Sequence, residues 1–203
     1  MVKFIYDNYK DDPERLVDRL INMKIDQKIN IDLKGEGDAK IPHPQDNNWN
    51  GISLPWMAFG YGVMMTPLQT LTFYNAVANN GEMVKPSFIS SIGAFGEKPV
   101  YEIQREVIMP SICSRETLIA VQKMLKNVVE KPWGTANNIY DKNIKIAGKT
   151  GTSQIDYTSS ETQYVSSFVG YFPSDKPKYS AIVVINKPKK SKGYYGNSVA
   201  APV

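Results

Sequence analysis

The chain has 203 residues, of which 42% are hydrophobic and 22% charged, which is ordinary for one globular domain with a sizeable core. Its net charge of +4 is mild and spread along the chain, so it does not argue for a nucleic-acid-binding protein. A single cysteine, Cys113, and a single histidine, His43, exclude an internal disulfide and are too few for a zinc site, and neither lies in a recognisable nucleophile motif. We therefore expect no metal and no cofactor.

The first half of the chain predicts helices separated by a long loop. Asp12-Pro13 starts a helix, because Asp is a good N-cap and Pro fits the first turn. Its apolar residues repeat at helical spacing: Leu16, Val17, Leu20 and Ile21. Residues 30–51 are rich in Gly, Pro, Asp and Asn, which predicts a long loop of the kind that is often functional. Thr66-Pro67 opens the clearest helix, which ends near Gly81.

The second half predicts short strands, a helix and then a sheet. Residues 86–110 indicate short strands and turns. Ser114 caps a helix that Pro132 ends and whose apolar stripe is Leu118, Val121, Leu125 and Val128. Three strands follow, over about 144–152, 165–172 and 179–186. This order predicts an α+β protein with an antiparallel sheet beside helices. The basic run 187–192 is best interpreted as a solvated loop after the last strand.

The first of these strands is predicted to end in Lys149-Thr150-Gly151-Thr152-Ser153, the most informative stretch of the chain. A Lys-Thr-Gly strand is one of three elements in serine enzymes that act on penicillin and D-alanyl peptides. One ammonium and two hydroxyls at a strand end can hold a substrate carboxylate, and a backbone N–H such as that of Thr152 can stabilise an oxyanion. Gly151 lacks a Cβ, so another group can approach the backbone there.

The other two elements of such a site are missing from the sequence. No serine has Lys three residues later, and none has Asn two residues later. Tyr6-Asp7-Asn8 matches a Tyr-x-Asn variant, but we expect it to lie inside a helix. A three-residue match arises by chance in roughly a few per cent of chains of this length, so Lys-Thr-Gly alone does not decide between a binding site and an ordinary strand end.

The rest of the chain supplies further motifs in one order. They are Ile31-Asp32-Leu33-Lys34-Gly35-Glu36, Gly60-Tyr61-Gly62 with Thr66-Pro67-Leu68-Gln69, Ala78-Asn79-Asn80-Gly81, Gly134-Thr135-Ala136, Ala147-Gly148-Lys149-Thr150-Gly151-Thr152-Ser153, Ser167-Phe168-Val169-Gly170-Tyr171-Phe172-Pro173 and Tyr195-Gly196-Asn197. On these motifs, residues 30–203 closely resemble the transpeptidase domain of class B penicillin-binding proteins, most of all the division-type subgroup.

The resemblance implies a β-lactamase/transpeptidase-like α+β fold with an antiparallel sheet flanked by helices, present here only in part. Residues 1–203 would be the C-terminal portion of one transpeptidase domain, without the nucleophile-bearing portion, the first two strands and the final helix. The resemblance implies that Lys149 provides positive charge in the active site, and that Thr150, Thr152 and Ser153 bind substrate carboxylates or β-lactams. It gives the Thr152 amide to the oxyanion hole and makes Gly151 the small residue that admits the acyl group.

The resemblance also implies a function for the parent, a serine D,D-transpeptidase that cross-links peptidoglycan and binds penicillins. Its partners would be stem peptides ending in D-Ala-D-Ala, β-lactams and divisome proteins, not nucleic acid. The parent would be anchored in the cytoplasmic membrane with its catalytic domain outside, although these residues contain no signal peptide and no apolar run long enough for a span.

For the chain itself we expect no activity, because the nucleophile motif is missing, and we expect self-association through uncovered apolar surface. An alternative interpretation is a nucleophile-free module that binds D-Ala peptides or a division partner. A D,D-carboxypeptidase or a β-lactamase is a third option on the same fold.

Overall fold

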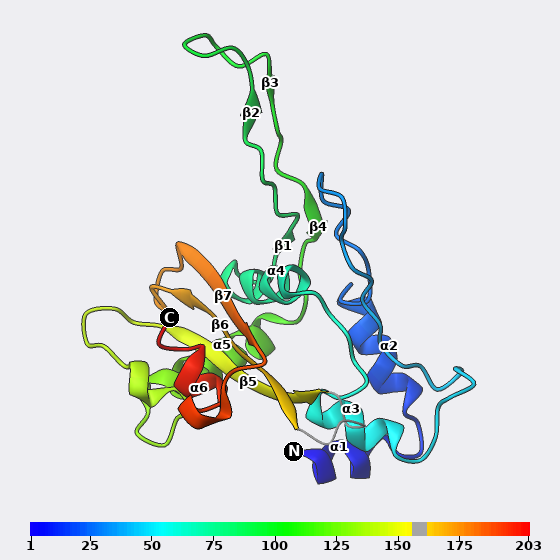
Figure 1. The fold of residues 1–203 in the computed structure, drawn as a ribbon. Helices are drawn as coiled ribbons and strands as arrows, with labels where there is room; N and C mark the ends of the chain where they lie inside the picture. Colours follow the sequence, from blue (N-terminus) through cyan, green and yellow to red (C-terminus); the bar gives the residue numbers. More distant parts are fainter. Residues whose placement is uncertain (156–161) are drawn as a thin grey trace. The chain divides into compact units, whose positions relative to one another are not determined.

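A computed structural model describes residues 1–155 and 162–203. The chain divides into two compact units: residues 1–72 with 83–110, and residues 73–82 with 111–203. The described residues contain both helices and antiparallel sheets, so the α+β prediction is confirmed (Figure 1).

The first unit is built on short helices packed around a small core. It contains α1 (Val2–Tyr9), α2 (Glu14–Asn22), α3 (Ser53–Phe59) and the start of α4 (Pro67–Ala78). Its buried core is Val17, Ile41 and Met57, against which Leu20, Ile21, Ile25, Trp49 and Val63 pack. The predicted helix after Asp12 is confirmed, and the Asp12 carboxylate accepts the backbone N–H of Arg15 at 3.3 Å. Tyr6-Asp7-Asn8 lies inside α1, as expected.

One helix of this unit, α3, did not follow from the sequence. The sequence there reads as apolar and glycine-punctuated, and the helix is only two turns long. Tertiary packing explains it, because Leu54, Met57 and Ala58 are buried and α3 contacts α1. Gly60, with φ of 92°, ends the helix in the left-handed conformation that glycine adopts readily.

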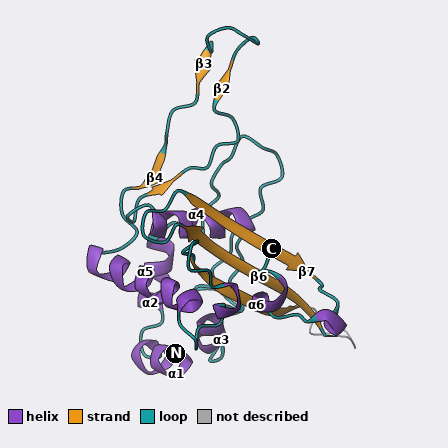
Figure 2. Ribbon diagram, turned by 90° about the vertical axis from the view of Figure 1, so that its left-hand side faces the viewer, coloured by secondary structure: helices purple, strands orange, loops and turns teal. Residues whose placement is uncertain are grey.

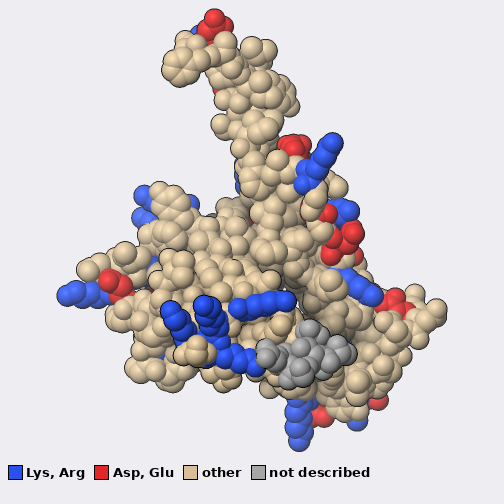
Figure 3. All heavy atoms as spheres, in the orientation of Figure 1, with Lys and Arg blue, Asp and Glu red and all other residues tan. Residues whose placement is uncertain are grey.

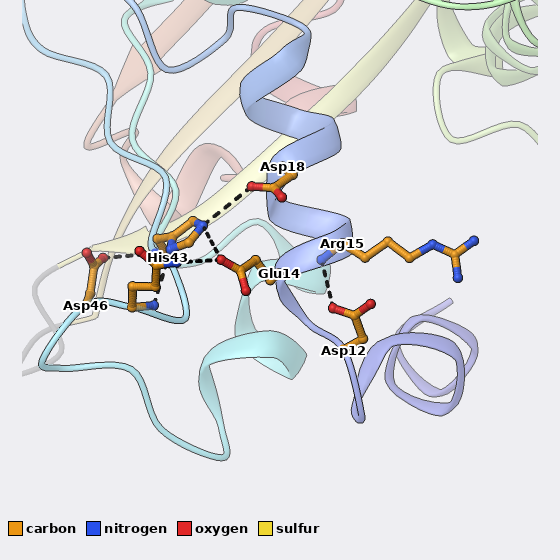
Figure 4. Close-up of polar contacts among 7 residues, drawn as sticks. Asp12, Glu14, Arg15, Asp18, His43 and Asp46 are labelled. Atoms are coloured by element: carbon orange, nitrogen blue, oxygen red, sulfur yellow. Dashed lines mark hydrogen bonds and ion pairs between the residues drawn. The ribbon is translucent and has the colours of Figure 1, made fainter.

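A histidine attaches the predicted long loop to α2 (Figure 4). Glu14 and Asp18 are four residues apart and so lie on one face of the helix. His43 Nε2 lies 3.8 Å from Glu14 Oε1 and 3.5 Å from Asp18 Oδ1. The backbone N–H of Gln45 donates to His43 Nδ1 at 3.2 Å, which leaves the neutral ring with its hydrogen on Nε2, facing the carboxylates.

The loop before His43 is organised by another carboxylate, that of Glu36. Glu36 accepts the backbone N–H groups of Ile29, Asn30 and Ile31 at 2.6, 2.9 and 3.3 Å. Hydrogen bonds to an ionised acceptor are stronger than neutral ones. Glu36 ends the Ile-Asp-Leu-Lys-Gly-Glu motif, so in this structure the motif stabilises the loop.

The predicted short strands of residues 86–110 are confirmed as an antiparallel arm. β1 (Met83–Val84) pairs with β4 (Val107–Met109), and β2 (Ser91–Ile92) pairs with β3 (Tyr101–Glu102) further out (Figure 1). The arm is too thin to bury its apolar side chains, and it leaves exposed Phe88, Ile92, Phe95, Val100 and Tyr101.

The second unit contains the sheet, whose strand order is β5-β6-β7 and whose pairing is antiparallel throughout (Figure 2). The strands are β5 (Ala147–Ile155), β6 (Gln163–Phe172) and β7 (Tyr179–Asn186). Helix α5 (Arg115–Glu130) contacts β5, and α6 (Gly196–Val199) contacts β5 and β6. Two short 3-10 helices complete the unit, η1 (Asn137–Ile139) and η2 (Lys190–Lys192).

The predicted boundaries of the first strand were wrong. The strand starts at Ala147 instead of Ile144, because the Asp141 carboxylate accepts the backbone N–H groups of Asn143 and Ile144 and forms a turn there. It continues to Ile155, paired with Gln163. Lys149-Thr150-Gly151 therefore lies within the strand and not at its end.

The helix that precedes the sheet follows the prediction with one change. Ser114 caps α5 by accepting the backbone N–H of Thr117 at 3.3 Å, and the helix ends at Glu130, before Pro132. The last fully buried residue of its stripe is Val129, whereas Val128 is only half-buried. Cys113 is half-buried. Within the described ranges no helix is long and apolar enough to cross a membrane.

Asp175 links α5 to the start of the sheet and generates a pH prediction. Its carboxylate lies 2.7 Å from Lys126 Nζ and 2.8 Å from Lys145 Nζ, and these hydrogen bonds lower the pKa of Asp175 to about 2. A carboxyl whose pKa is lower in the folded state stabilises the fold above its unfolded pKa of 3.8, and this stabilisation is lost as the pH falls toward 2.

We predict that Asp175→Asn lowers the unfolding midpoint above about pH 4, and that the difference from the unmodified chain disappears as the pH approaches about 2. The Asp175 side chain is 50% exposed, so added salt should shrink the difference. Thermal unfolding followed by circular dichroism measures it. Glu97→Gln, at an exposed carboxylate without an ion pair among the described residues, is the matched control and should show no such pH dependence.

Candidate active site

The five candidate residues Lys149 to Ser153 lie along one strand, and the sheet determines their positions. Lys149 pairs with Val169, Thr150 with Phe168, Gly151 with Ser167 and Thr152 with Ser166. On its other side β5 pairs with no strand among the described residues. An unpaired strand edge presents backbone N–H and C=O groups to which an extended peptide can add.

Lys149 contributes an accessible positive charge at this edge. Its Nζ donates to the carbonyl oxygen of Thr150 at 2.6 Å, and no carboxylate of the described residues pairs with it. The side chain remains exposed, yet surrounding atoms displace part of its water, and this desolvation lowers the pKa of Lys149 below its ordinary value. An ammonium has three hydrogens, so two stay available to a ligand.

The hydroxyl of Thr150 is held by a second threonine. Thr150 Oγ1 and Thr135 Oγ1 lie 3.1 Å apart, within hydrogen-bond distance. Thr135 belongs to the turn between α5 and η1, where the backbone N–H of Ala136 donates to the carbonyl oxygen of Val128. The sequence contains Gly134-Thr135-Ala136 as a motif, but nothing in it assigns Thr135 to the site.

Thr152 is held by a residue close to the C-terminal end of the sequence, Gly196. Its Oγ1 accepts the backbone N–H of Gly196 at 2.9 Å, so its hydroxyl hydrogen remains available to a ligand. On the neighbouring strand the buried Ser166 hydroxyl donates to the carbonyl oxygen of Tyr194. Residues 194–196 are therefore attached to both β5 and β6, a contribution to the site that the sequence did not predict.

Two glycines allow this close packing. A Cβ on Gly196 would collide with the carbonyl oxygen of Gly151 and lie 2.5 Å from that of Ser167. A Cβ on Gly151 would lie 2.5 Å from Ser167 Oγ. The close approach that Gly151 permits in this structure is thus one between neighbouring strands. Ser153 lies exposed on β5 beyond Thr152.

Further positive charge lies near the far end of the sheet. Lys187, Lys189 and Lys190 line a cavity of about 550 Å³ together with Tyr164, whose ring stacks on that of Tyr194 at 4.1 Å. Figure 3 shows basic side chains gathered where α6 and the adjoining strand ends lie in Figure 1. None of these lysines forms an ion pair with a carboxylate of residues 1–155 or 162–203. The surface beside the candidate site is therefore cationic.

The described residues offer neither a metal centre nor a recognisable nucleophile. No three His, Cys, Asp or Glu side chains come together in a way that suits a metal ion, as far as residues 1–155 and 162–203 show. Ser153 lies on β5 and Ser167 on β6, but neither is followed by Lys at the third position. The arrangement can bind and polarise an anionic group, and it contains no activated hydroxyl.

Comparison with known proteins identifies the fold and the family. A family model described as "Penicillin binding protein transpeptidase domain" matches residues 8–203. The chain therefore belongs to the penicillin-binding protein transpeptidase domain family, and its relatives are of the class B, FtsI-like type.

Among these relatives is peptidoglycan D,D-transpeptidase FtsI of Buchnera aphidicola, 29% identical over 190 residues, which cover 93% of this chain and 31% of that protein. Penicillin-binding protein PbpB of Mycolicibacterium smegmatis is 31% identical over 200 residues, covering 94% of this chain and 30% of that protein. The chain thus spans about a third of the length of the relatives that it matches.

Solved structures agree with this assignment. Penicillin-binding protein 3 of Mycobacterium tuberculosis superimposes with a TM-score of 0.76 at 30% identity, covering 94% of this chain and 44% of that one. That protein has been solved in complexes with aztreonam and with ampicillin. Penicillin-binding protein 2B of Streptococcus pneumoniae has a TM-score of 0.77 at 21% identity, covering 97% of this chain and 32% of that one, and shares the fold.

The contact at Gly196 generates a prediction about the site. We predict that Gly196→Ala destabilises the chain by about 1–3 kcal/mol, because the added methyl group must displace the backbone of β5 or detach residues 194–196. Denaturant unfolding measures this free energy. Gly51→Ala is the matched control, since a Cβ there meets nothing within 4 Å, and it should be neutral. Equal destabilisation by both variants would contradict the account.

Proposed function

We propose that residues 1–203 are the C-terminal portion of a transpeptidase domain and supply one wall of a D-Ala-D-Ala transpeptidase site. One observation carries this proposal. An accessible lysine and two oriented hydroxyls lie along a strand edge that pairs with no other described strand, in a family to which peptidoglycan D,D-transpeptidases belong.

In the parent, a serine supplied by residues outside this chain attacks the carbonyl carbon of the penultimate D-Ala. The peptide bond breaks, the terminal D-Ala leaves with a proton, and an acyl-enzyme remains. An amine of a second stem peptide then attacks the acyl carbon, and the serine hydroxyl is regenerated. The oxyanion of each tetrahedral intermediate would accept a hydrogen bond from the Thr152 amide.

The groups on β5 suit the recognition half of this reaction. The substrate ends in a carboxylate, for which Lys149 Nζ and the hydroxyls of Thr150 and Thr152 are donors, and exposed Ser153 extends the row. β-Lactams carry a carboxylate in a comparable place, so we propose that they use the same donors. Lys187, Lys189 and Lys190, which pair with no carboxylate of the described residues, favour an anionic ligand at longer range.

A second candidate function is favoured by the absence of both serine motifs from the 203 residues. It is a module that binds D-Ala-ended peptides, or a division protein, without forming a covalent bond. From the resemblance and the FtsI-type relatives, we also propose that the parent works with cell-division proteins and is anchored in the cytoplasmic membrane with this domain outside it.

We predict that a labelled penicillin forms no covalent adduct with the 203-residue chain, because a β-edge with donors but no activated serine binds without acylating. Intact-mass spectrometry after incubation measures this. An FtsI-type relative of full length is the positive control. An adduct on the native chain, mapped to one serine, would contradict the proposal that the nucleophile lies elsewhere.

The free edges of the sheet generate a prediction of self-association. β7 pairs only with β6 among the described residues, and Val184 on it is 39% exposed. We predict that the sedimentation coefficient rises with concentration and that Val184→Lys reduces this rise, because a charge on an edge strand opposes pairing. Ile119→Lys, at a 53% exposed isoleucine of helix α5 and therefore not on a strand edge, is the control that should leave it unchanged. A concentration-independent monomer would refute the prediction.

A further inference from the structure

A small pocket in the first unit is lined by aromatic and neutral polar side chains, none of which is among the candidate residues Lys149 to Ser153. Its volume is about 260 Å³. Three aromatic residues and three short polar residues line it: Trp49, Trp56, Tyr61, Asn48, Asn50 and Ser53. We call it the aromatic pocket. The remaining lining residues are also uncharged.

The aromatic walls are held by the end of α3. Gly60 turns the chain back, with φ of 92°, and the backbone N–H of Tyr61 donates to the carbonyl oxygen of Trp56 at 3.0 Å. The two rings consequently lie with centroids 5.7 Å apart and planes inclined at 58°. Trp56 is 47% exposed, whereas Trp49 packs against the core of the unit. The pocket thus has one partly buried and one more exposed indole.

The polar rim is also ordered. The Asn50 amide donates to the carbonyl oxygen of Asn48 at 3.3 Å and accepts the backbone N–H of Ile52 at 3.0 Å. Ser53 Oγ accepts the backbone N–H of Asn50 at 3.0 Å, which leaves its hydroxyl hydrogen available. The Asn48 side chain is exposed and has no partner among the described residues. Hydroxyl and amide groups therefore surround the aromatic walls.

This lining selects a class of ligand. Inclined aromatic faces contact apolar C–H surfaces, and amides and hydroxyls exchange hydrogen bonds with neutral polar groups. A carboxylate or a phosphate would find no cation in the pocket. A pyranose ring combines a C–H face with a rim of hydroxyls and, in N-acetylated sugars, an amide.

We infer that the aromatic pocket binds the glycan strand of peptidoglycan, a neutral chain of N-acetylated hexosamines. The inference rests on the proposed function, because peptidoglycan joins such strands to the peptides that β5 would hold. It adds a second contact to the same polymer, on a different unit of the chain. A sugar ring would stack on Trp56 and Tyr61 and bond to Asn48, Asn50 and Ser53.

The test uses the whole 203-residue chain and chitotetraose, a β-1,4-linked tetramer of N-acetylglucosamine that carries no peptide. The chain has three tryptophans, so three indole N–H resonances report on the location of binding. We expect the resonances of Trp49 and Trp56 to shift with saturation, while that of Trp133, 74% exposed and in the other unit, stays in place. Cellotetraose, which lacks the acetamido groups, should bind more weakly.

Calorimetric titration of variants gives the affinity. Trp56→Ala should weaken chitotetraose binding about tenfold, the effect of losing one aromatic contact. Trp133→Ala, which removes an exposed indole elsewhere, should leave it unchanged. Asn48→Ala supplies a second variant at an exposed side chain, whose loss does not disturb the core, and it should also weaken binding. Circular dichroism verifies that each variant is folded.

Three results would overturn the inference: no saturable binding of the tetrasaccharide, equal loss in Trp56→Ala and Trp133→Ala, or binding of an apolar peptide in place of the sugar. These outcomes are separable from failure of the proposed function. If a D-Ala-D-Ala peptide shifts the β5 amide resonances but chitotetraose does not bind, only the glycan contact is rejected. The reverse pattern rejects the transpeptidase proposal and leaves a sugar-binding pocket.

Discussion

Antiparallel pairing between β5 and β6 fixes the position of every group in the candidate active site. The register places Lys149, Thr150, Gly151 and Thr152 opposite four consecutive residues of β6. Because side chains alternate along a strand, a shift of one residue would exchange the faces on which the lysine and the threonines lie. The register is therefore the constraint on which the recognition chemistry depends, and it is set by backbone hydrogen bonds at a distance from any ligand.

Glycines make that register possible. Gly148 and Gly170 are paired across the strands, and a Cβ on Gly148 would lie 2.6 Å from the carbonyl oxygen of Val169. Gly196 lets the start of α6 approach the backbone of β5, where Thr152 Oγ1 accepts the backbone N–H of Gly196. The backbone of β5 is therefore held in place by direct contacts with the backbones of β6 and α6 at these glycines. Such contacts are rigid, which suits a surface that has to be in place before a substrate arrives.

The sequence predicted much of this architecture, for local reasons. Ser114 and Thr66-Pro67 are capping signals whose effect depends on neighbours in sequence, and both helices begin there. The strand that carries Lys149 begins and ends three residues later than the sequence predicted. The turn formed by Asp141 competes with strand pairing at residues 143 and 144, and the alternation of apolar residues gives no sign of this turn. Helix α3 depends on burial of Met57 against Val17, a tertiary contact that no local pattern reveals.

The candidate site likewise has residues that the sequence predicted and residues that only the fold brings together. Lys149 to Ser153 are contiguous, so a motif finds them. Thr135 and residues 194–196 reach β5 only through the fold, across separations of 15 and 44 residues in the two hydrogen bonds that they make. Glu36 shows the converse case, since a motif residue in the loop accepts three backbone amides and stabilises the fold. A motif match alone does not separate these two roles, whereas the contacts do.

The central claim is that β5 recognises a peptide carboxylate through Lys149 and its neighbouring hydroxyls. Titration of an isotopically labelled chain with a peptide ending in D-Ala-D-Ala, followed by amide chemical shifts, tests it most directly. The account predicts saturable shifts centred on Lys149 to Ser153 and on Thr135 and Gly196, abolished by Lys149→Met and by amidation of the peptide's C-terminus. Saturable shifts confined to other elements, or binding that survives both changes, would contradict it.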